Sequence, residues 1–254
     1  IFEKAAKKYI KKKMKDGNML VLGIESSSMV ASVAIISDEK IICEYTINNK
    51  KTHSQTILPM IDEMIKMSEI DKKDIDAIAV SGGPGSFTGL RIGGALAKGL
   101  GFALNIPLIH VKTLEGMAFQ LYGTKELIVP IMDAKRNQVY TGIYENENEF
   151  KVIKEQTPQD IEELIQELNQ TGRKVTFLGD GIFCYKDIIE EKCKVEYTFA
   201  PSHCNMPRAA SVAALGLKMY NEGNYQNASE FLPDYLRVSQ AERERNERLK
   251  HGNN

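Results

Sequence analysis

The chain has 254 residues, and its 33 lysines and arginines against 34 aspartates and glutamates give a net charge of −1, which excludes an overall basic field for binding nucleic acids. Its four cysteines show no CxxC spacing, which disfavours zinc sites and disulfides and indicates buried thiols in a reducing, cytoplasmic compartment. No apolar run approaches the roughly 18 residues that a membrane-spanning helix needs, so no membrane role is expected.

Residues 1–18 differ from the rest of the chain, because they carry seven lysines against two acidic residues. A basic segment of this kind is usually a solvated tail, although it can also contact RNA or an acidic surface. We treat it as a basic N-terminal extension and expect Met19 to be the natural start of the folded part.

From Met19 the pattern is that of β-structure, with one apolar run in 19–25 and two more on either side of a turn at 37–40. Three strands in sequence predict an antiparallel meander. Glu25 ends the first run, with Ser26 and Ser27 behind it. These side chains either cap the turn or contact a metal ion or a phosphate.

Residues 52–67 predict an amphipathic helix, because their apolar positions keep a period near 3.6. Methionines extend the apolar edge of this helix and suit either core packing or contact with a partner. The apolar residues of this helix that could pack in the core or contact a partner are Ile57, Met60, Ile61 and Met64.

The chain is organised around a buried strand at 75–80, a glycine-rich loop at 81–86 and a helix at 87–104, which Ser86 or Thr88 would cap. A strand, a loop and a helix N-terminus can together hold an anion. The GxxxxGK[ST], GxGxxG and GxSxG motifs are nevertheless absent, so the standard motifs assign neither a nucleotide nor a nucleophile.

Small residues recur every four positions along this helix, so they share one of its faces. They are Gly89, Gly93, Ala97 and Gly101. Such a stripe lets a second backbone approach closely, either that of the chain's own sheet or that of a partner.

The remaining chain again alternates strands and helices, which indicates a second α/β lobe. The predicted strands are 107–111, 126–131, 138–144 and 174–178. The predicted helices are 113–121, 158–168 with Thr157 as its N-cap, and 209–220.

In their order along the chain, these motifs resemble the bacterial TsaB family, formerly YeaZ, of tRNA threonylcarbamoyladenosine biosynthesis proteins. The most specific motif is GPGSFTGLRIG at 83–93. The other matching pieces are LGIESSSMVASVAI at 22–35, THSQTILPMID at 52–62, IPLIHVKTLEGMA at 106–118, PIMDAKRNQVYTGIY at 130–144, FLGDG at 177–181 and PDYLRVSQAE at 233–242.

The resemblance implies an α/β protein with the two-lobed actin-like ATPase (ASKHA) fold, in which each lobe is a mixed β-sheet flanked by helices. It places the first lobe at 19–112 and the second at 113–221. The C-terminal segment, about 222–254, is a candidate to return to the first lobe.

The family is similar to TsaD, a metal-dependent transferase that moves threonylcarbamoyl onto the tRNA adenosine next to the anticodon. TsaD holds its metal with a His-x-x-x-His pair, and the matching positions here are Thr113 and Met117. A hydroxyl and a thioether cannot replace two imidazoles. The resemblance therefore implies a catalytically silent, metal-free scaffold subunit that supports TsaD, together with a TsaE ATPase and indirect tRNA contact through the complex.

In the family, the glycine-rich helix and the methionine-edged helix before it form the surface that joins TsaD, or a second copy when TsaD is absent. Packing on the chain's own sheet is the alternative for these positions. The resemblance assigns to the surface Ile57, Met60, Ile61, Met64, Phe87, Gly89, Leu90, Gly93, Ala97 and Gly101.

Actin-like proteins usually end the first strand in an aspartate that faces phosphate, whereas this chain has the longer Glu25. Glu25, Ser26, Ser27 and Asp133 are the candidate nucleotide or cleft contacts, and a structural role is the favoured alternative for Asp133. No intrinsic cofactor is expected, and ATP or ADP would bind only at the interface with the partner subunit. Two other functions stay open, an independent metal-dependent peptidase of the glycoprotease-like family and an ATP-binding sugar or acetate kinase.

Overall fold

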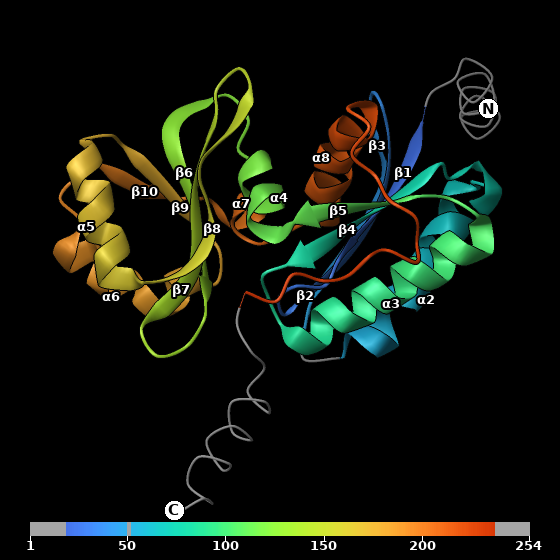
Figure 1. Cartoon of the computed structure of the whole chain (residues 1–254), viewed down its shortest axis with the longest axis horizontal. Coiled ribbons are helices and arrows are strands. Elements are labelled where there is room, and N and C mark those ends of the chain that lie inside the picture. Colours follow the sequence, from blue (N-terminus) through green and yellow to red (C-terminus); the bar gives the residue numbers. More distant parts are fainter. Residues whose placement is uncertain (1–18, 50–51, 237–254) are drawn as a thin grey trace, which may run out of the picture.

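The computed structural model describes residues 19–49 and 52–236, so the basic extension and the end of the C-terminal segment lie outside the described residues. The described chain forms two lobes, each built on one five-stranded mixed sheet (Figure 1). The strand order is β3-β2-β1-β4-β5 in the first sheet and β10-β9-β6-β7-β8 in the second. The two-lobed α/β architecture expected from the sequence is therefore present.

The first lobe contains the predicted antiparallel meander of three strands, and the next two strands run parallel to the first. Its elements are β1 (Leu20–Glu25), β2 (Val30–Ser37), β3 (Ile41–Asn48), α2 (His53–Ser68), the short 3-10 helix η1 (Lys72–Asp74), β4 (Ala77–Gly83), α3 (Phe87–Leu104) and β5 (Leu108–Lys112). Every residue of β1, β2 and β4 is buried, as expected for strands covered on both faces.

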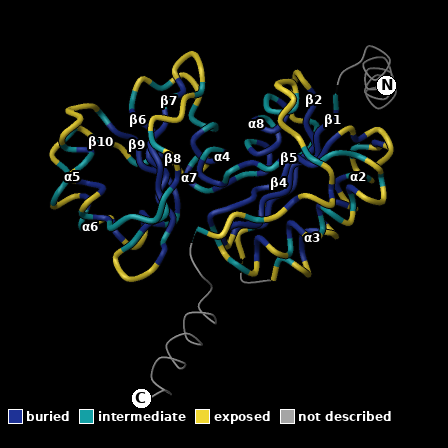
Figure 2. The backbone as a smooth tube through the Cα atoms, viewed as in Figure 1, coloured by how far each residue is buried: buried dark blue, intermediate teal, exposed yellow. Residues whose placement is uncertain are grey.

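One face of the first sheet is covered by α2 and α3. Ile57 and Met64 of α2 and Ala97 of α3 pack in one cluster with Leu22 and Ile78 of the sheet. Figure 2 shows the resulting contrast between the buried strands and the exposed outer sides of the two helices. The apolar stripes predicted on both helices thus face the sheet of their own lobe.

The opposite face of the first sheet is covered by α8 (Ala209–Asn221), which corrects the lobe boundary expected at 221. Val212 and Leu215 of α8 pack with Val21 and Ile109 of the first sheet (Figure 1). The periodicity of 209–220 predicted the helix itself, but a local pattern does not say which sheet an amphipathic helix covers. The chain therefore crosses back to the first lobe before α8.

After α8 the chain stays on the first lobe over the rest of its described length. Leu108 and Gln226 form a short antiparallel bridge between β5 and this segment. Phe231 is fully buried in the core beneath α3, and the Asp234 N–H donates to the Gly82 carbonyl over 2.6 Å. These contacts bring the C-terminal segment to the glycine-rich loop.

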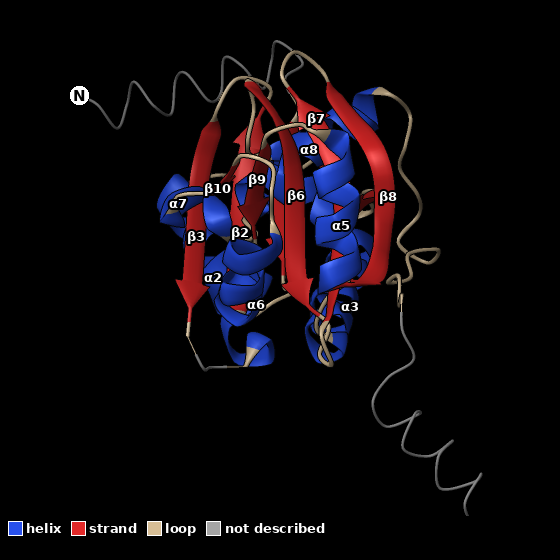
Figure 3. Ribbon diagram, turned by 90° about the vertical axis from the view of Figure 1, so that its left-hand side faces the viewer, coloured by secondary structure: helices blue, strands red, loops and turns tan. Residues whose placement is uncertain are grey.

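The second lobe has helices on both faces of its sheet. Its elements are α4 (Thr113–Phe119), β6 (Thr124–Asp133), β7 (Gln138–Asn146), β8 (Phe150–Asp160), α5 (Ile161–Thr171), β9 (Val175–Leu178), α6 (Gly181–Lys192), β10 (Tyr197–Phe199) and α7 (Ser202–Asn205). Figure 3 looks onto the outer face of this lobe, where α5 and α6 lie in front of the sheet. On the side toward the first lobe, Leu114 and Met117 of α4 pack with Ile128 and Tyr144.

The helix predicted at 158–168 is present as α5, but its predicted start and its Thr157 cap are wrong. Residues up to Asp160 belong to β8, and α5 begins only at Ile161. The Asp160 carboxylate caps α5 by accepting from the Glu162 and Glu163 N–H groups at 2.8 and 3.4 Å. Proline is tolerated within β8 because this strand lies at the edge of its sheet.

Candidate functional site

A cavity of about 620 Å³ opens between the loops of the two lobes. The first lobe lines it with the loop after β1, the glycine-rich loop and the start of α3, and the second lobe with the end of β6 and the turn that follows. The lining residues that bear on function are Ser27, Phe87, Asp133, Lys135, Asp180 and Tyr235. Cavities of this size hold small ligands in many proteins.

The start of α3 is covered by the chain's own loop after β1. The Ser86 N–H donates to the Ser27 carbonyl over 2.6 Å, and the Ser86 hydroxyl accepts from the Gly89 N–H at 3.2 Å, as the predicted N-cap. The Ser26 hydroxyl in turn donates to the Gly89 carbonyl over 2.9 Å. Two of the N–H groups that could cradle a phosphate at this helix N-terminus, those of Ser86 and Gly89, are thus already used inside the protein.

The small residues of α3 are explained by the same loop. A Cβ on Gly89 would lie 2.0 Å from the Ser26 carbonyl oxygen, and one on Gly93 would lie 2.2 Å from the Ser26 hydroxyl. The backbone that approaches this stripe is therefore that of the chain's own first lobe. The sequence left open whether the stripe packs within the chain or on a partner, and packing within the chain is what the structure has.

Glu25 is fully buried and does not line the cavity. One of its carboxylate oxygens accepts from the Ser27 N–H over 2.6 Å, which makes Glu25 a turn cap. Burial raises the pKa of Glu25, although hydrogen bonds from Ser27 and Ser81 act against this rise. Of the three candidate contacts in this loop, only Ser27 lines the cavity, and all three are fully buried.

Asp133 lines the second-lobe side of the cavity and is held by groups of its own lobe. Its carboxylate accepts from the Lys135 N–H at 2.8 Å and from the Tyr185 hydroxyl at 3.0 Å, and it pairs with the Lys135 ammonium. Burial alone would raise the pKa of Asp133, but the hydrogen bonds from Lys135 and Tyr185 outweigh it and lower the pKa. Asp133 therefore has both a structural role and a place in the cleft.

Asp180 is a cleft residue that the sequence interpretation did not single out. Its carboxylate accepts from the Asp133 N–H at 3.2 Å, and burial, reinforced by the charge of Asp133, raises its pKa. The sequence did carry a signal for Asp180, because Asp133 ends β6 and Asp180 comes two residues after the end of β9, which runs parallel to β6. The carboxyl ends of neighbouring parallel strands meet at one edge of a sheet.

The positions that match the metal ligands of TsaD lie on α4. Thr113 and Met117 are both buried, and Met117 packs in the core of the second lobe. Their hydroxyl and thioether groups do not suit a hard or borderline divalent ion. In residues 19–49 and 52–236, no group of three or more His, Cys, Asp or Glu side chains could hold a metal ion.

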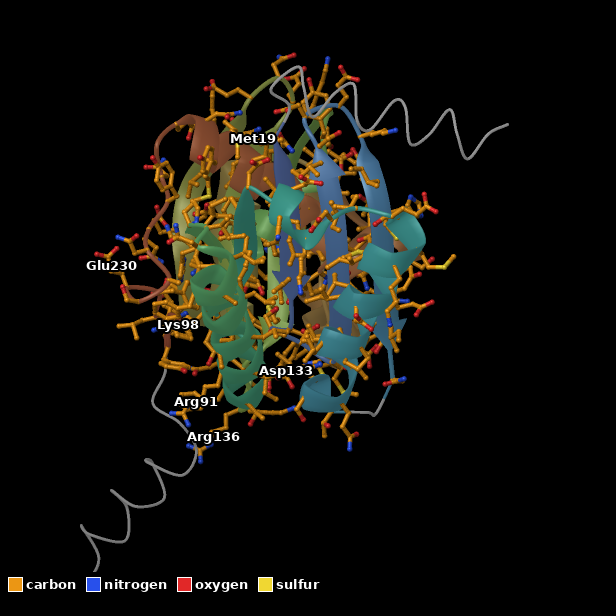
Figure 4. All side chains as sticks on the ribbon, turned by 90° about the vertical axis from the view of Figure 1, so that its right-hand side faces the viewer. Met19, Arg91, Lys98, Asp133, Arg136 and Glu230 are labelled. Carbon is orange, nitrogen blue, oxygen red and sulfur yellow. The ribbon has the colours of Figure 1, made fainter. Side chains whose placement is uncertain are left out.

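Nine of the ten residues predicted at a partner surface are buried inside the first lobe, and the tenth, Phe87, is half-buried at the cleft. The large apolar residues that α2 and α3 do expose are Leu58, Met67 and Phe102. Figure 4 views the first lobe from the side where the two helices lie next to each other. A partner surface on α2 and α3 thus remains a prediction. The apolar side chains that could contact a partner there are Leu58, Met67 and Phe102.

Known proteins of one family are similar to this chain along most of its length. A family model described as TsaD, tRNA N6-adenosine threonylcarbamoyltransferase, matches residues 40–245. The tRNA threonylcarbamoyladenosine biosynthesis protein TsaB of Bacillus subtilis is 33% identical over 226 residues, which cover 88% of this chain and 96% of that protein. TsaB of Escherichia coli is 30% identical over 230 residues, which cover 86% of this chain and 95% of that protein.

A solved structure titled YeaZ from Pseudomonas aeruginosa matches with a TM-score of 0.74 at 24% identity, over 86% of this chain and 100% of that one. This match shows the fold, which is the two-lobed actin-like fold with mixed sheets flanked by helices. Within the described part of the chain, no helix has the length and apolar character needed to cross a membrane. On its sequence similarity to the two curated relatives, the chain belongs to the TsaB family of tRNA threonylcarbamoyladenosine biosynthesis proteins.

Proposed function

We propose that this chain is a non-catalytic scaffold subunit, which binds a TsaD-type transferase and supports transfer of threonylcarbamoyl to the tRNA adenosine next to the anticodon. The observation that carries the proposal is that α2 and α3 expose three large apolar side chains, Leu58, Met67 and Phe102, which are 51%, 67% and 63% exposed. Large apolar side chains left exposed on neighbouring helices favour a protein partner. The buried Thr113 and Met117 support the non-catalytic part, because they offer no imidazole to a metal ion.

The same proposal covers the other components of the complex. A second copy of the chain would occupy the α2–α3 surface when TsaD is absent, a TsaE ATPase would join the complex, and tRNA would be held by the complex as a whole. ATP or ADP would bind only together with the partner subunit, which is supported by the Ser27 loop that covers the start of α3. A cytoplasmic location is supported by the cysteines, all four of which are free thiols.

The test is native mass, measured by light scattering on a sizing column. The chain is run alone and then mixed with the TsaD-type protein of the same organism. We expect a homodimer that converts to a mixed complex. Leu58→Asp or Phe102→Asp places a charge in the proposed interface, so we expect either variant to weaken the mixed complex at least about tenfold.

Phe183→Asp is the matched control, because Phe183 is an exposed aromatic residue on α6 of the second lobe, away from α2 and α3. We expect this variant to pair like the parent chain. A mass that the TsaD-type protein leaves unchanged would sink the scaffold proposal. Equal weakening by Phe102→Asp and Phe183→Asp would move the interface away from α2 and α3.

A further inference from the structure

A second cavity lies at the end of the first lobe opposite the glycine-rich loop. Its volume is about 470 Å³, and the turn between β2 and β3 forms one of its walls. This turn begins where Ser37 pairs with Leu20 at the start of β1, whereas the glycine-rich loop follows the end of β4, which runs parallel to β1. The Met19 N–H donates to Asp38 of the turn over 2.9 Å, and Figure 4 shows Met19 at the opposite end of the molecule from Asp133 of the interlobe cavity. The two cavities are therefore separate sites.

The walls of this second cavity, which we call the rear cavity, come from both lobes. The first lobe supplies the β2–β3 turn and α8, and the second lobe supplies Phe119 and Gln120 at the end of α4 and Cys204 of α7. Helix α8 leaves room for the cavity, because the residues that line it there include Ala210 and Ala214. A ligand in the rear cavity would therefore contact both lobes.

The lining of the rear cavity is mainly apolar. Ile36 and Leu217 line it and are buried, whereas Ile41 lines it and is 55% exposed to solvent. Phe119 adds an aromatic ring from the second lobe. A cavity of a few hundred Å³ with apolar walls and a small number of polar groups is the usual form of a small-molecule site.

The charges around the rear cavity balance one another. Asp38 and Glu39 line it together with Lys40 and Arg208, so two acidic side chains face two basic ones. Arg208 is in addition paired with the Glu44 carboxylate. A charged ligand would have to compete with these pairs, and burying its charge without a partner would be costly. The lining thus favours a neutral ligand.

One polar atom of the lining lacks a partner. Gln120 Nε2 donates to the Met206 carbonyl over 3.4 Å, which sets the orientation of the side-chain amide. Gln120 Oε1 is buried and has no hydrogen-bond partner within the described residues. Buried polar atoms of this kind are nearly always hydrogen-bonded in folded proteins. A ligand with an N–H or O–H group would supply the missing hydrogen bond.

We propose that the rear cavity binds a small, neutral and largely apolar molecule, one N–H or O–H group of which donates to Gln120 Oε1. The body of the molecule packs against Ile36, Phe119 and Leu217. Because these residues belong to different lobes, the ligand ties the position of one lobe to that of the other. The site is independent of the proposed function, since it uses neither α2 and α3 nor the interlobe cavity.

Indole is the probe, because it is neutral and apolar and has one N–H donor. Benzofuran is its matched comparison, since it has the same size and a ring oxygen in place of the N–H group. Titration of the full chain, read by saturation-transfer NMR of each compound, should show indole binding at least about fivefold more tightly. Gln120→Met removes the acceptor and should erase this preference. Gln159→Met changes a glutamine that does not line the cavity, so it should keep the preference.

Cys204 reports where the probe binds. Indole at about three times its Kd leaves about a quarter of the sites free, so it should slow alkylation of Cys204 by iodoacetamide about fourfold. Cys184, an exposed thiol of α6 that does not line the cavity, is the control and should react at an unchanged rate. Mass spectrometry of the alkylated chain measures both. Ala214→Phe fills the cavity and should abolish binding and protection, and if this variant does not fold, Gln120→Met decides.

Equal affinity for indole and benzofuran in the parent chain would overturn the proposal. A preference for indole that persists in Gln120→Met would overturn it too, because the donor would then have another partner. Alkylation of Cys204 that indole leaves unchanged would place the probe elsewhere and have the same consequence. Pairing with the TsaD-type protein is measured without indole, so failure of the scaffold proposal and failure of this one are distinguishable.

Discussion

At the scale of single residues, two glycines of α3 have very different surroundings. A Cβ on Gly89 would lie 2.0 Å from a backbone carbonyl oxygen of the loop after β1, whereas one on Gly99 would meet nothing within 4 Å. Glycine in a helix interior costs about 1 kcal/mol relative to alanine. The close approach of the loop explains why Gly89 bears that cost, while packing within this chain does not explain Gly99.

This contrast predicts opposite effects of the same substitution in one helix. Gly99→Ala should raise the free energy of unfolding by about 0.5–1 kcal/mol, because alanine restricts the unfolded chain and fits the helix. Gly89→Ala should lower it by about 1–3 kcal/mol, because the backbone must move to admit the methyl group. Urea unfolding followed by circular dichroism measures both. Equal effects at the two positions would contradict the close packing of the loop on α3.

The candidate site could be predicted only in part from the residues. The family resemblance offered Ser27 and Asp133 as nucleotide or cleft contacts, and the strand, glycine-rich loop and helix N-terminus indicated a possible anion site. The sequence could not show that Glu25 is enclosed, since burial depends on how the loop closes over α3. Tyr235 was out of reach for a similar reason, because its partner Phe87 lies almost 150 residues earlier and only the folded chain brings them together.

At the scale of helices and strands, the sequence predicted the elements that carry a clear period. The elements β1 to β3, α2 and α3 lie close to their predicted positions, because their apolar residues are either continuous or spaced as in a helix. The strand β8 was missed, since its sequence, FKVIKEQTPQD, mixes charged residues and a proline. An edge strand tolerates both, so its local pattern is weak.

The boundary between β8 and α5 leads to a prediction. Asp160→Ala removes the carboxylate that accepts from the Glu162 and Glu163 N–H groups, so it should lower the free energy of unfolding by about 1 kcal/mol. Thr157→Ala is the control, because Thr157 was the cap expected from sequence and lies within β8. It should change stability by less than about 0.5 kcal/mol. A larger loss at Thr157 than at Asp160, in thermal or urea unfolding, would refute the assigned cap.

At the scale of the whole molecule, the two lobes are joined by more than the two chain crossings. Lys112 at the end of β5, in the first lobe, pairs with Glu155 of β8, in the second lobe, over 2.6 Å. Local patterns do not predict such contacts, because they join residues from different lobes. For the same reason the sequence placed α8 in the second lobe, although α8 completes the core of the first.

A buried hydrogen bond joins the two lobes, from Gln156 Nε2 of β8 to the Gly83 carbonyl at the end of β4, and it is 3.0 Å long. Gln156→Met keeps much of the side-chain volume but leaves this carbonyl without its donor, which should cost about 1–3 kcal/mol. The amides of residues 82–86 should then exchange hydrogen faster, because the glycine-rich loop loses its support from the second lobe. Hydrogen exchange read by mass spectrometry would show this change on the first lobe, although the substitution lies on the second.

Gln159→Met separates coupling between the lobes from damage within β8. The Gln159 amide contacts Lys154 and Glu167, both in the second lobe, at 2.8 and 3.1 Å. Its loss should therefore leave exchange at residues 82–86 unchanged. If both variants accelerate exchange in that loop equally, β8 acts on the first lobe through its general stability. If only Gln156→Met does so, a single amide transmits the position of the second lobe to the glycine-rich loop that precedes α3.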